Sequence, residues 1–590
     1  MLNHAQQEAV RVNGHAVITA CPGSGKTTVL KHRAAFLLKT KPDSVLCGVT
    51  FTSESAAELD SRIRAEVQDA GTRVVCGTFH SLCKRQLTKA GHKFVLVNDL
   101  QQAELMKRAF FDTVEETKCS MEDAIKYIEH IKAQSDPILP LPKSTPIVLV
   151  YHRYQELLRQ MGAMDFSDLL VECVRGMANG SVAPVTTENG IVTDMLVDEF
   201  QDTDEVQLAW VMEHVRQGAV VTIVGDDDQS VYGWRRALGF EGLNRFKKDT
   251  NATHIALNLT YRCSREIITH AAKLIVHNTE RVEKSLETAN KERGEVRVQR
   301  FNSRADEVSG LMRAIILSGT PGDWGVLART NAQLDEVEQA LKVEEIRYVR
   351  SGGTSFWEMP APALFLGVCQ SLGAGDMIGV DDLLRKCGVS EGNISKIHKA
   401  CNSKKAGALD RFLHGALATE PESKDKLGMA RKRLAEWRVM IAKGEAKMAM
   451  EGLALFIRKN HDLKAFPMTP KMIARDQKML EQCVGTLSKL SGNMQSRLAT
   501  LRNFEKQNSD TKDGEAVRLM TLHSSKGLEF DRVWILGCED GVLPSAKSPV
   551  EEERRLFFVG MTRAKRFLHL SLSFEKANDP SPFIFESGIR

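Results

Sequence analysis

The segment ACPGSGKTT (residues 20–28) has glycines, a lysine and threonines at the spacing of a phosphate-binding loop. Ala20 stands where the usual pattern has its first glycine. In such a loop, backbone N–H groups at the start of a helix cradle phosphate oxygens. Lys26 is expected to reach the β and γ phosphates of a nucleotide, and the Thr27 hydroxyl to ligate Mg²⁺. The residues predicted to bind the nucleotide here are Pro22, Gly23, Ser24, Gly25, Lys26, Thr27 and Thr28.

Two adjacent acids in LVDEFQDTD (196–204) add a reaction to this binding loop. Asp198 ends an apolar run, where it can hold the Mg²⁺ shell, and Glu199 is placed to polarise a water against the γ phosphate. Unpaired carboxylates at a strand end repel one another, which argues against a purely structural role. The pair favours hydrolysis over phosphoryl transfer to a small acceptor.

Two arginines are candidates for stabilising the charge of the transition state. Arg262 lies in LTYRCSREI (259–267) and Arg563 in FFVGMTRAKR (557–566), and both fall in a presumed second domain. An arginine delivered from another domain would make hydrolysis depend on closure of a cleft. The alternative is that either one is a surface arginine.

The segment VGDDDQSVYGWRR (224–236) sets three acids and Gln229 directly before aromatic and cationic residues. Its first half is typical of a site for a nucleotide, and its second half of a site for something flat and negatively charged. The alternative for Trp234 is a buried position in the core. The adjacent Arg235 and Arg236 argue against burial.

Short apolar runs that end in Gly, Thr or acid recur along the chain and predict buried parallel strands with helices between them. This alternation predicts a doubly wound α/β domain with its site at the carboxyl ends of the strands. A second set of runs predicts a second α/β domain of similar build. The predicted strands are 15–20, 45–52, 74–80, 195–200 and 219–229, then 295–301, 321–329, 515–523, 531–537 and 566–573.

Two long stretches interrupt these strands, and both are predicted to be mostly helical insertions. The second holds 26 Lys and Arg against 16 Asp and Glu, including NSKKAG (402–407) and MARKRLAEWR (429–438), although the whole chain carries a net charge of only +4. Such a regional bias favours contact with phosphates over a merely solvated helical surface. The predicted division is a first core (1–86 and 181–259) with insertion 87–180, and a second core (260–365 and 513–590) with insertion 366–512.

The composition is that of a soluble, cytoplasmic protein. Its 590 residues are too many for a single core. No apolar run reaches transmembrane length, and the amino terminus lacks a signal-peptide pattern. The twelve cysteines never form C-x-x-C, so neither a disulfide framework nor a zinc or iron–sulfur site is predicted.

Together the motifs form an ordered set that resembles the UvrD/Rep/PcrA-like helicases of superfamily 1, over nearly the whole chain. The matching segments are LNHAQQEAV (2–10), ACPGSGKTT (20–28), TFTSESAAEL (50–59), GTFHSLCKR (77–85), MDFSDLL (164–170), VDEFQDTD (197–204), VGDDDQSVYGWRRA (224–237), LTYRCSREI (259–267), VLARTNAQ (326–333), MTLHSSKGLEF (520–530) and VGMTRAKR (559–566). The resemblance implies two RecA-like P-loop NTPase motor domains, each with a mostly helical insertion.

The resemblance also implies roles for the matching residues, with ATP and Mg²⁺ as cofactors. Gln6 would read the adenine edge, Tyr261 would stack on the base, and Glu529 would lie near the ribose. Gln229 would contact the γ phosphate, together with Arg262 and Arg563. The residues that would line the track for single-stranded DNA are Phe51, Thr52, Thr78, His80, Tyr232, Trp234, Arg235, Asn331, Thr521 and His523.

The chain departs from the family pattern in several places. Arg236 occupies a position that usually holds Gly, and the insertion 366–512 is shorter than in larger relatives. Within it, LLRKCGVSEGNISKIHKA (383–400) only loosely resembles the Gly-rich hairpin that contacts duplex DNA. Because the chain stops soon after VGMTRAKR, we expect neither a carboxyl-terminal partner-binding extension nor an appended nuclease domain.

These observations predict an ATP-driven motor that moves 3′ to 5′ along single-stranded DNA and unwinds duplex DNA, in replication, repair or recombination. One alternative is a translocase that strips proteins from single strands with little unwinding. Others are a nucleotide-dependent binding module without motor activity and a motor of 5′ to 3′ polarity. The expected partners are single-stranded DNA, single-strand/duplex junctions and accessory or loading proteins. We expect a monomer in solution that does not bind membranes.

Overall fold

The protein is described by a computed structural model that covers residues 2–67, 70–113, 119–134, 142, 145–402, 407–415, 424–459, 470–509, 514–575 and 579–589. Its residues form two compact units. The first comprises Met1–Val296, Leu543–Phe567 and Ser581–Arg590, and the second comprises Arg297–Val542 and Leu568–Pro580. No helix among the described residues is long and apolar enough to cross a membrane.

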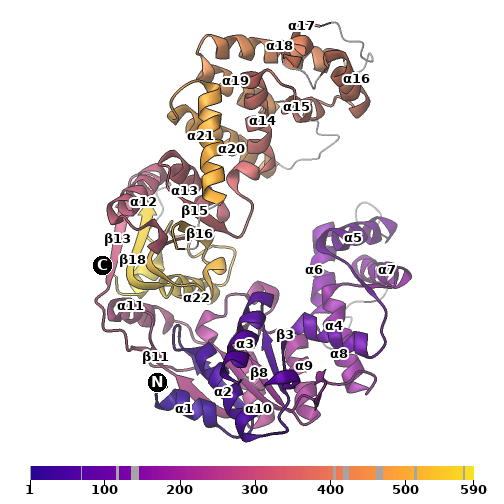
Figure 1. The fold of residues 1–590 in the computed structure, drawn as a ribbon, viewed down its shortest axis with the longest axis vertical. Helices are drawn as coiled ribbons and strands as arrows, with labels where there is room; N and C mark the ends of the chain where they lie inside the picture. Colours follow the sequence, from indigo (N-terminus) through magenta and orange to yellow (C-terminus); the bar gives the residue numbers. More distant parts are fainter. Residues whose placement is uncertain are drawn as a thin grey trace. The chain divides into compact units, whose positions relative to one another are not determined.

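The first unit is built on a six-stranded parallel sheet, ordered β10-β1-β9-β8-β2-β3 (Figure 1). Its five predicted strands are confirmed, and the edge strand β10 was not predicted. Successive strands are joined by helices, as a parallel sheet requires. The strands are β1 (Ala16–Ala20), β2 (Leu46–Thr50), β3 (Val74–Thr78), β8 (Asp194–Val197), β9 (Val220–Gly225) and β10 (Thr253–Leu257).

Alternating side chains along these strands fill two separate hydrophobic cores, one on each face of the sheet. In β1, Ile18 packs with α1, α2 and α3, whereas its neighbour Val17 shares the other core with α4, α8, α9 and α10. This double covering explains why the strands are apolar throughout. The helices are α1 (His4–Arg11), α2 (Lys26–Thr40), α3 (Ser53–Glu66), α4 (Phe79–Lys89), α8 (Phe166–Ala178), α9 (Glu205–Arg216) and α10 (Gly239–Thr250).

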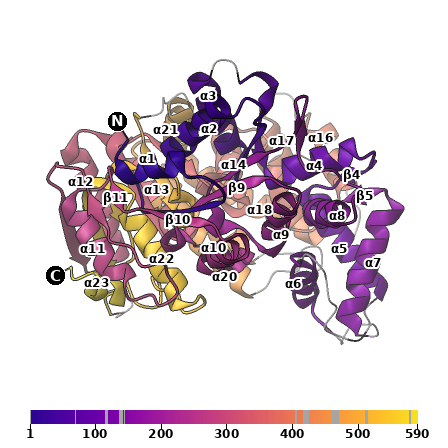
Figure 2. The same cartoon turned by 90° about the horizontal axis from the view of Figure 1, so that it is seen from below.

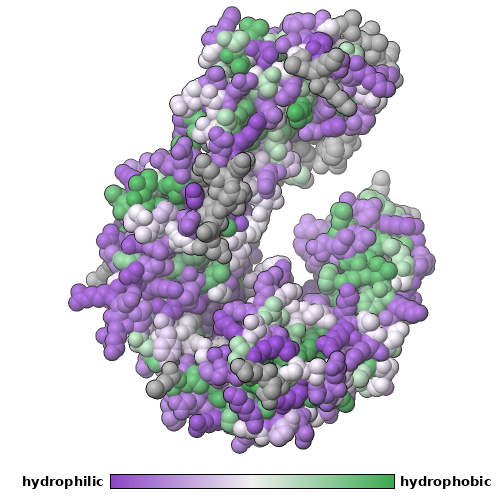
Figure 3. All heavy atoms as spheres, in the orientation of Figure 1, coloured by the Kyte–Doolittle hydropathy of each residue, from purple (hydrophilic) through white to green (hydrophobic). Residues whose placement is uncertain are grey.

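An insertion in this unit has a hydrophobic core of its own, formed by α5 (Asp99–Thr113), α6 (Met121–Lys132) and α7 (Pro146–Gln160). Figure 2 shows these helices as a separate group. Two short parallel strands, β4 (Val95–Leu96) and β5 (Ala163–Met164), close its base. The following helix α8 lies within the predicted insertion but packs in the core of the sheet. Leu100 and Phe111 of α5 are exposed, and Figure 3 shows hydrophobic residues on this face.

Three helices from beyond the first sheet also belong to the first unit: α11 (Arg265–Ile275), α22 (Val550–Met561) and α23 (Pro582–Glu586). Helix α22 packs on α11 and on the short helix η3 (Asp227–Gln229). Two short strands, β11 (Leu259–Thr260) and β12 (Glu287–Thr288), pair in the same unit. The chain therefore returns to the first unit after tracing most of the second.

The second unit contains another six-stranded sheet, ordered β13-β18-β17-β14-β16-β15, in which β17, β14, β16 and β15 pair in parallel. The five strands predicted here are confirmed, and β15 was not predicted. Helices α12 (Arg304–Ser318) and α13 (Asn331–Val343) pack on this sheet. The strands are β13 (Glu295–Phe301), β14 (Trp324–Ala328), β15 (Tyr348–Ser351), β16 (Val517–Thr521), β17 (Phe530–Ile535) and β18 (Ala564–Ser573).

The described part of the second insertion is entirely helical and has a single large hydrophobic core. Thr486 of α20 donates a 2.8 Å hydrogen bond to Gln339 of α13, which ties the insertion to the sheet. Residues 403–406 of the NSKKAG segment lie outside the described residues. The helices are α14 (Pro360–Ala374), α15 (Val380–Lys386), α16 (Glu391–Cys401), α17 (Ala408–His414), α18 (Lys424–Ala442), α19 (Ala446–Lys459), α20 (Pro470–Lys489) and α21 (Met494–Ser509).

Candidate nucleotide and nucleic-acid site

The predicted phosphate loop connects β1 to α2 and depends on two glycines with positive φ. Gly23 has φ +73° and Gly25 has φ +83°, a region that favours glycine. A Cβ at Gly23 would lie 2.5 Å from Arg262 Cβ, and one at Gly25 would lie 3.1 Å from Gln6 Nε2. No side chain caps the start of α2. The loop therefore forms a close-fitting cradle at a helix N-terminus, which fits a bound phosphate chain.

Lys26 and the predicted acid pair meet at the mouth of this loop. Lys26 Nζ lies 3.0 Å from Glu199 Oε1. Burial lowers the pKa of Lys26, but Glu199, Asp198 and Asp226 outweigh burial and raise it overall. Glu199 adopts φ +51°, an uncommon conformation for this residue type. Its N–H donates a 2.9 Å bond to Asp198 Oδ1. The lysine and the predicted base therefore pair with each other.

Gln201 lies in the same motif as the acid pair, but no role was predicted for it. It is fully buried, and its Nε2 donates a 2.5 Å bond to Glu199 Oε2. Its Oε1 accepts a 2.9 Å bond from the Asp226 N–H at the end of the neighbouring strand β9. Gln201 thus connects the predicted base to the segment that carries Gln229. Sequence spacing could not reveal this, because Asp226 lies 25 residues away.

Gln229 lies between an acid and one of the two predicted arginines. Its Nε2 donates a 2.5 Å bond to Asp226 Oδ2, and its Oε1 accepts a 2.8 Å bond from Arg563 Nη2. Arg563 is fully buried, and burial together with nearby Arg262 lowers its pKa to about 9. Arg262 Nη1 donates a 3.3 Å bond to the Thr562 carbonyl. The structure thus brings both arginines together with Gln229 in the first unit, and the surface-arginine alternative is wrong for Arg563.

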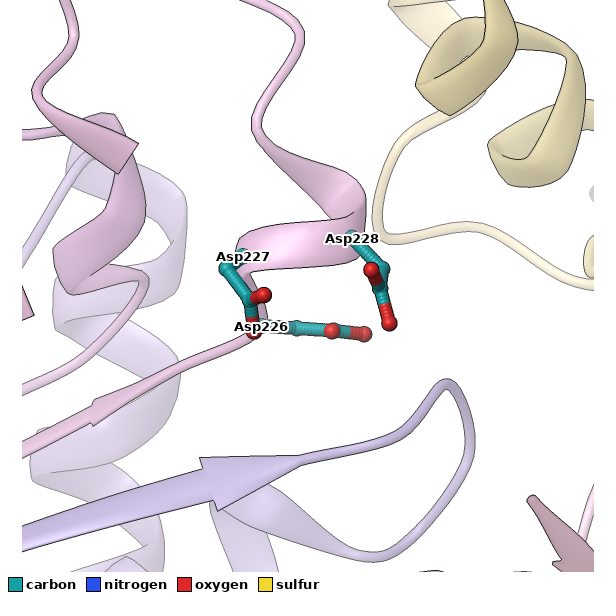
Figure 4. A group of neighbouring side chains, drawn as sticks. All are labelled: Asp226, Asp227 and Asp228. Atoms are coloured by element: carbon teal, nitrogen blue, oxygen red, sulfur yellow. The ribbon is translucent and has the colours of Figure 1, made fainter. Parts of the chain in front are cut away.

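The three acids before Gln229 are paired with buried cations. Figure 4 shows Asp226, Asp227 and Asp228 where β9 runs into η3, with carboxylate oxygens within 4.8 Å of one another. Lys284 Nζ lies 2.7, 2.6 and 3.1 Å from these three carboxylates in turn, and Arg281 binds Asp228 through two bonds of 2.9 and 2.8 Å. The acids therefore form a buried ionic cluster with cations from a later segment, and Asp226 also bonds Gln229.

The predicted adenine-binding residues also lie together. Gln6 Nε2 donates a 2.9 Å bond to the Ser24 carbonyl of the phosphate loop. Asn3, which caps α1 reciprocally with Gln6, donates a 3.0 Å bond to the Tyr261 hydroxyl. The Tyr261 N–H donates a 2.9 Å bond to the Gly23 carbonyl, while 47% of the residue's surface stays exposed. This leaves a tyrosine ring available beside the phosphate loop.

Aromatic residues gather on the predicted DNA side of the first unit. Phe51, which follows β2, stacks on Tyr232 with ring centroids 6.0 Å apart and planes 7° apart. Trp234 packs edge-on against Tyr232, and the Arg235 guanidinium lies 4.5 Å from the Trp234 ring centre. Because Trp234 is 63% exposed, the alternative of a buried core tryptophan is wrong. Exposed rings beside an arginine are suited to stacking on bases.

Thr52, Thr78 and His80 lie at the carboxyl ends of the neighbouring strands β2 and β3. The two threonine hydroxyls cap helices α3 and α4, accepting bonds of 3.1 Å from the Ser55 N–H and 3.2 Å from the Ser81 N–H. His80 packs edge-on against Phe166, and burial lowers the pKa of its imidazole. Each of these residues therefore has a local structural role beside any contact with DNA.

A contact that the sequence did not predict holds the turn before Trp234. Glu552, near the start of α22, accepts a 3.1 Å bond from the Gly233 N–H. A Cβ at Gly233 would lie 2.7 Å from Glu552 Oε2, so a larger residue here would displace the Glu552 carboxylate. Arg563, which bonds to Gln229, follows the other end of the same helix. Helix α22 therefore contacts the 224–236 segment at both of its functional halves.

The remaining predicted residues belong to the second unit. Asn331 starts α13 just after β14, and Thr521 ends β16, where it pairs in register with Ala328 of β14. His523 follows in a short helix. These three therefore lie at the carboxyl ends of adjacent strands. Glu529 directly precedes β17 and so lies at the opposite end of the sheet, apart from them.

The sequence of the chain is similar to known protein families and to individual proteins over nearly its whole length. The chain matches the model of the UvrD/REP helicase N-terminal domain over residues 2–251 and that of the UvrD-like helicase C-terminal domain over residues 255–360 and 424–575. DNA helicase II of Escherichia coli (strain K12) is 29% identical over 630 residues, covering 97% of this chain and 84% of that protein. ATP-dependent DNA helicase PcrA of Leuconostoc citreum is 29% identical over 658 residues, covering 99% and 84%. The chain therefore belongs to the UvrD/Rep/PcrA family of superfamily 1, a family of ATP-dependent DNA helicases.

Proposed function

We propose that this protein hydrolyses ATP to move 3′ to 5′ along single-stranded DNA and to unwind duplex DNA ahead of it, in replication, repair or recombination. The observation that carries this proposal is the 224–236 segment, in which buried Gln229 contacts Arg563 and exposed Trp234 lies five residues later. One short stretch of chain thus holds a polar group at the nucleotide loop and a base-stacking ring. We propose a cytoplasmic monomer that acts at single-strand/duplex junctions, alone or with accessory and loading proteins.

Hydrolysis would begin with the triphosphate in the cradle of Gly23 and Gly25. The phosphate oxygens would replace Glu199 as the partner of Lys26, which frees the Glu199 carboxylate to polarise the attacking water. Gln201 would keep that carboxylate oriented through its 2.5 Å bond. Arg262 and Arg563 would neutralise the charge that develops on the γ phosphate. Thr27 and Asp198 would hold Mg²⁺, which neutralises phosphate charge when it is bound.

Movement would follow from a change of partner at Gln229. With ATP bound, Arg563 would turn toward the γ phosphate, and Gln229 would keep one Nε2 hydrogen on Asp226 and direct the other toward that phosphate. After hydrolysis, Arg563 and Gln229 would return to each other. The short segment that follows would transmit this shift to Trp234. Stacking contributes about 1–3 kcal/mol per base, which is enough to hold a step and weak enough to release it. Tyr232, Phe51 and Arg235 would also contact the bound strand.

Strand displacement with ATP and Mg²⁺ tests this proposal on two duplexes that differ only in a 3′ or a 5′ single-stranded tail. We expect displacement of the 3′-tailed duplex alone. Displacement of only the 5′-tailed duplex would overturn the polarity. Loss of displacement in both, without any ATPase stimulated by DNA, would overturn the motor itself.

A second candidate is a translocase that strips proteins from single strands with little unwinding. It is favoured by the segment 383–400, which contains the end of α15 and nearly all of α16 and therefore presents helices to a duplex where larger relatives have a Gly-rich hairpin. This candidate predicts intact ATPase stimulated by DNA and removal of a bound streptavidin block from a single strand, with no displacement of either tailed duplex. We propose that the chain is divided into two cores and two insertions at the predicted boundaries, except that α8 belongs to the first core.

A further inference from the structure

Lys284 is a buried cation that has no part in the hydrolysis scheme above. Its side chain is fully buried, as are those of Asp226 and Asp227 that it bonds. It belongs to a segment without regular structure between α11 and β12. Burial lowers the pKa of Lys284, but the three carboxylates outweigh burial and raise it. An ammonium therefore occupies the centre of the acid cluster, where three converging carboxylates would otherwise suggest a metal ion (Figure 4).

The carboxylate of Asp226 links Lys284 to the side chain of Gln229. Asp226 Oδ1 accepts a 2.7 Å bond from Lys284, and Asp226 Oδ2 accepts a 2.5 Å bond from Gln229 Nε2. An amide has one donor end and one acceptor end. With the donor end directed at an ionised carboxylate, the acceptor end Oε1 faces Arg563 at 2.8 Å. The carboxylate of Asp226 thus sets which way the amide points.

Without Lys284, the three buried carboxylates would face one another without the one cation that contacts all three. Such groups move apart or take up protons, because burial and like charges both disfavour the ionised form. Either response would change what Asp226 offers to the amide. Arg281 cannot replace Lys284 in this respect, since its bonds go to Asp228.

We propose that Lys284 is a positioning residue for ATP hydrolysis, which acts through Asp226 to hold Gln229 with its amide oxygen toward Arg563. This inference rests on the proposed function of Gln229 and Arg563 at the γ phosphate. It assigns Lys284 a role in the reaction cycle rather than one in stability alone. Arg281, in the same cluster, stabilises the fold without orienting Gln229.

The test compares two charge-removing substitutions in the same cluster, Lys284→Met and Arg281→Met. ATPase is measured at saturating single-stranded DNA, and thermal unfolding is measured on the same samples. We expect Lys284→Met to lower kcat about 10- to 100-fold with less than about a 3-fold change in KM for ATP, because a transition-state contact is misplaced. We expect Arg281→Met to lower the melting temperature comparably but to keep kcat within about 3-fold of wild type, and Lys284→Arg to restore most of kcat. Equal losses of kcat in both methionine variants, or an unchanged kcat in Lys284→Met, would overturn the proposal.

Two further variants keep the test decisive. If Lys284→Met does not fold, the double variant Lys284→Met/Asp227→Asn is used instead. It removes one of the three buried carboxylates and leaves Asp226 unchanged, and we expect the same loss of kcat. Gln229→Ala separates this inference from the proposed function. If Gln229→Ala retains the full DNA-stimulated kcat, the proposed role of Gln229 fails. If it loses kcat but Lys284→Met does not, only the role of Lys284 fails. On the Gln229→Ala background, Lys284→Met should cause no further loss, since both act through one contact.

Discussion

The two six-stranded sheets share an architecture, yet the residues at their strand ends are suited to different chemistry. In the first sheet, the loop after β1 carries two glycines of positive φ and Lys26, and β8 ends in an acid pair. In the second, β14 and β16 end in residues with amide, hydroxyl and imidazole groups, namely Asn331, Thr521 and His523. A sheet thus supplies an edge, and the loop residues decide what that edge binds. We expect hydrolysis to depend on the first edge and DNA binding to involve both.

The largest effect is expected from Lys26→Ala in the phosphate loop. Losing the ammonium that is proposed to contact the β and γ phosphates should lower ATPase about 1,000-fold or more, while the affinity for single-stranded DNA stays within about 3-fold. Lys31→Ala is a matched control on the same helix, because Lys31 pairs with Glu66 instead. Retained ATPase without DNA binding would mean that the two functions are assigned to the wrong parts of this edge.

Trp234→Ala should uncouple the two halves of the 224–236 segment. Removing one stacked base contact of about 1–3 kcal/mol should reduce the DNA-stimulated ATPase about 10-fold, and more than the basal rate. Trp234→Phe keeps a ring and should retain most of the stimulation. If Trp234→Ala leaves the stimulation unchanged, this residue does not contact DNA.

A smaller effect is expected at the second sheet. Asn331→Ala removes an amide at the carboxyl end of β14 and should weaken binding of single-stranded DNA about 3- to 10-fold, as loss of an ordinary hydrogen bond worth about 0.5–1.5 kcal/mol does. The change in KM for ATP should be smaller than the change in DNA affinity. Fluorescence anisotropy with a labelled oligonucleotide measures the first quantity, and a steady-state ATP titration measures the second. A larger change in KM than in DNA affinity would remove the distinction between the two edges.

The smallest effect is expected in the basic insertion of the second unit, where Lys432 and Lys443 are exposed. Changing both to Glu should weaken DNA binding modestly. The salt dependence of the affinity should fall by about one unit of slope for each phosphate that the variant no longer neutralises. Affinities measured across a series of NaCl concentrations give this slope. An unchanged slope would mean that this surface does not contact DNA and would favour the alternative of a merely solvated helical surface.

Local motifs predicted the parallel strands and the phosphate loop because both depend on short-range patterns, namely apolar runs and glycine spacing. The edge strands β10 and β15 were missed because they lie at the sheet margins and carry more polar residues, such as Thr253 and Arg350. Lys284, Gln201 and Glu552 were missed for another reason. Each acts on a residue far away in sequence, and only the folded chain brings the partners together.

The acids of VGDDDQ show that a local pattern can mislead when the contacting residues are far away in sequence. Their composition is typical of a phosphate or metal site, but burial beside Lys284 makes them counter-ions within the protein. Trp234 shows the reverse. Its neighbours indicated exposure correctly, because two adjacent arginines are difficult to bury.

The coupling between the two halves of the 224–236 segment is tested most directly by the affinity for single-stranded DNA, measured with and without a non-hydrolysable ATP analogue. Wild type and Gln229→Ala are compared in the same titration. We predict that the analogue changes the affinity of the wild type and that Gln229→Ala abolishes this change while still binding DNA. The same analogue-dependent change in both proteins would contradict the proposal that Gln229 reports the γ phosphate to Trp234.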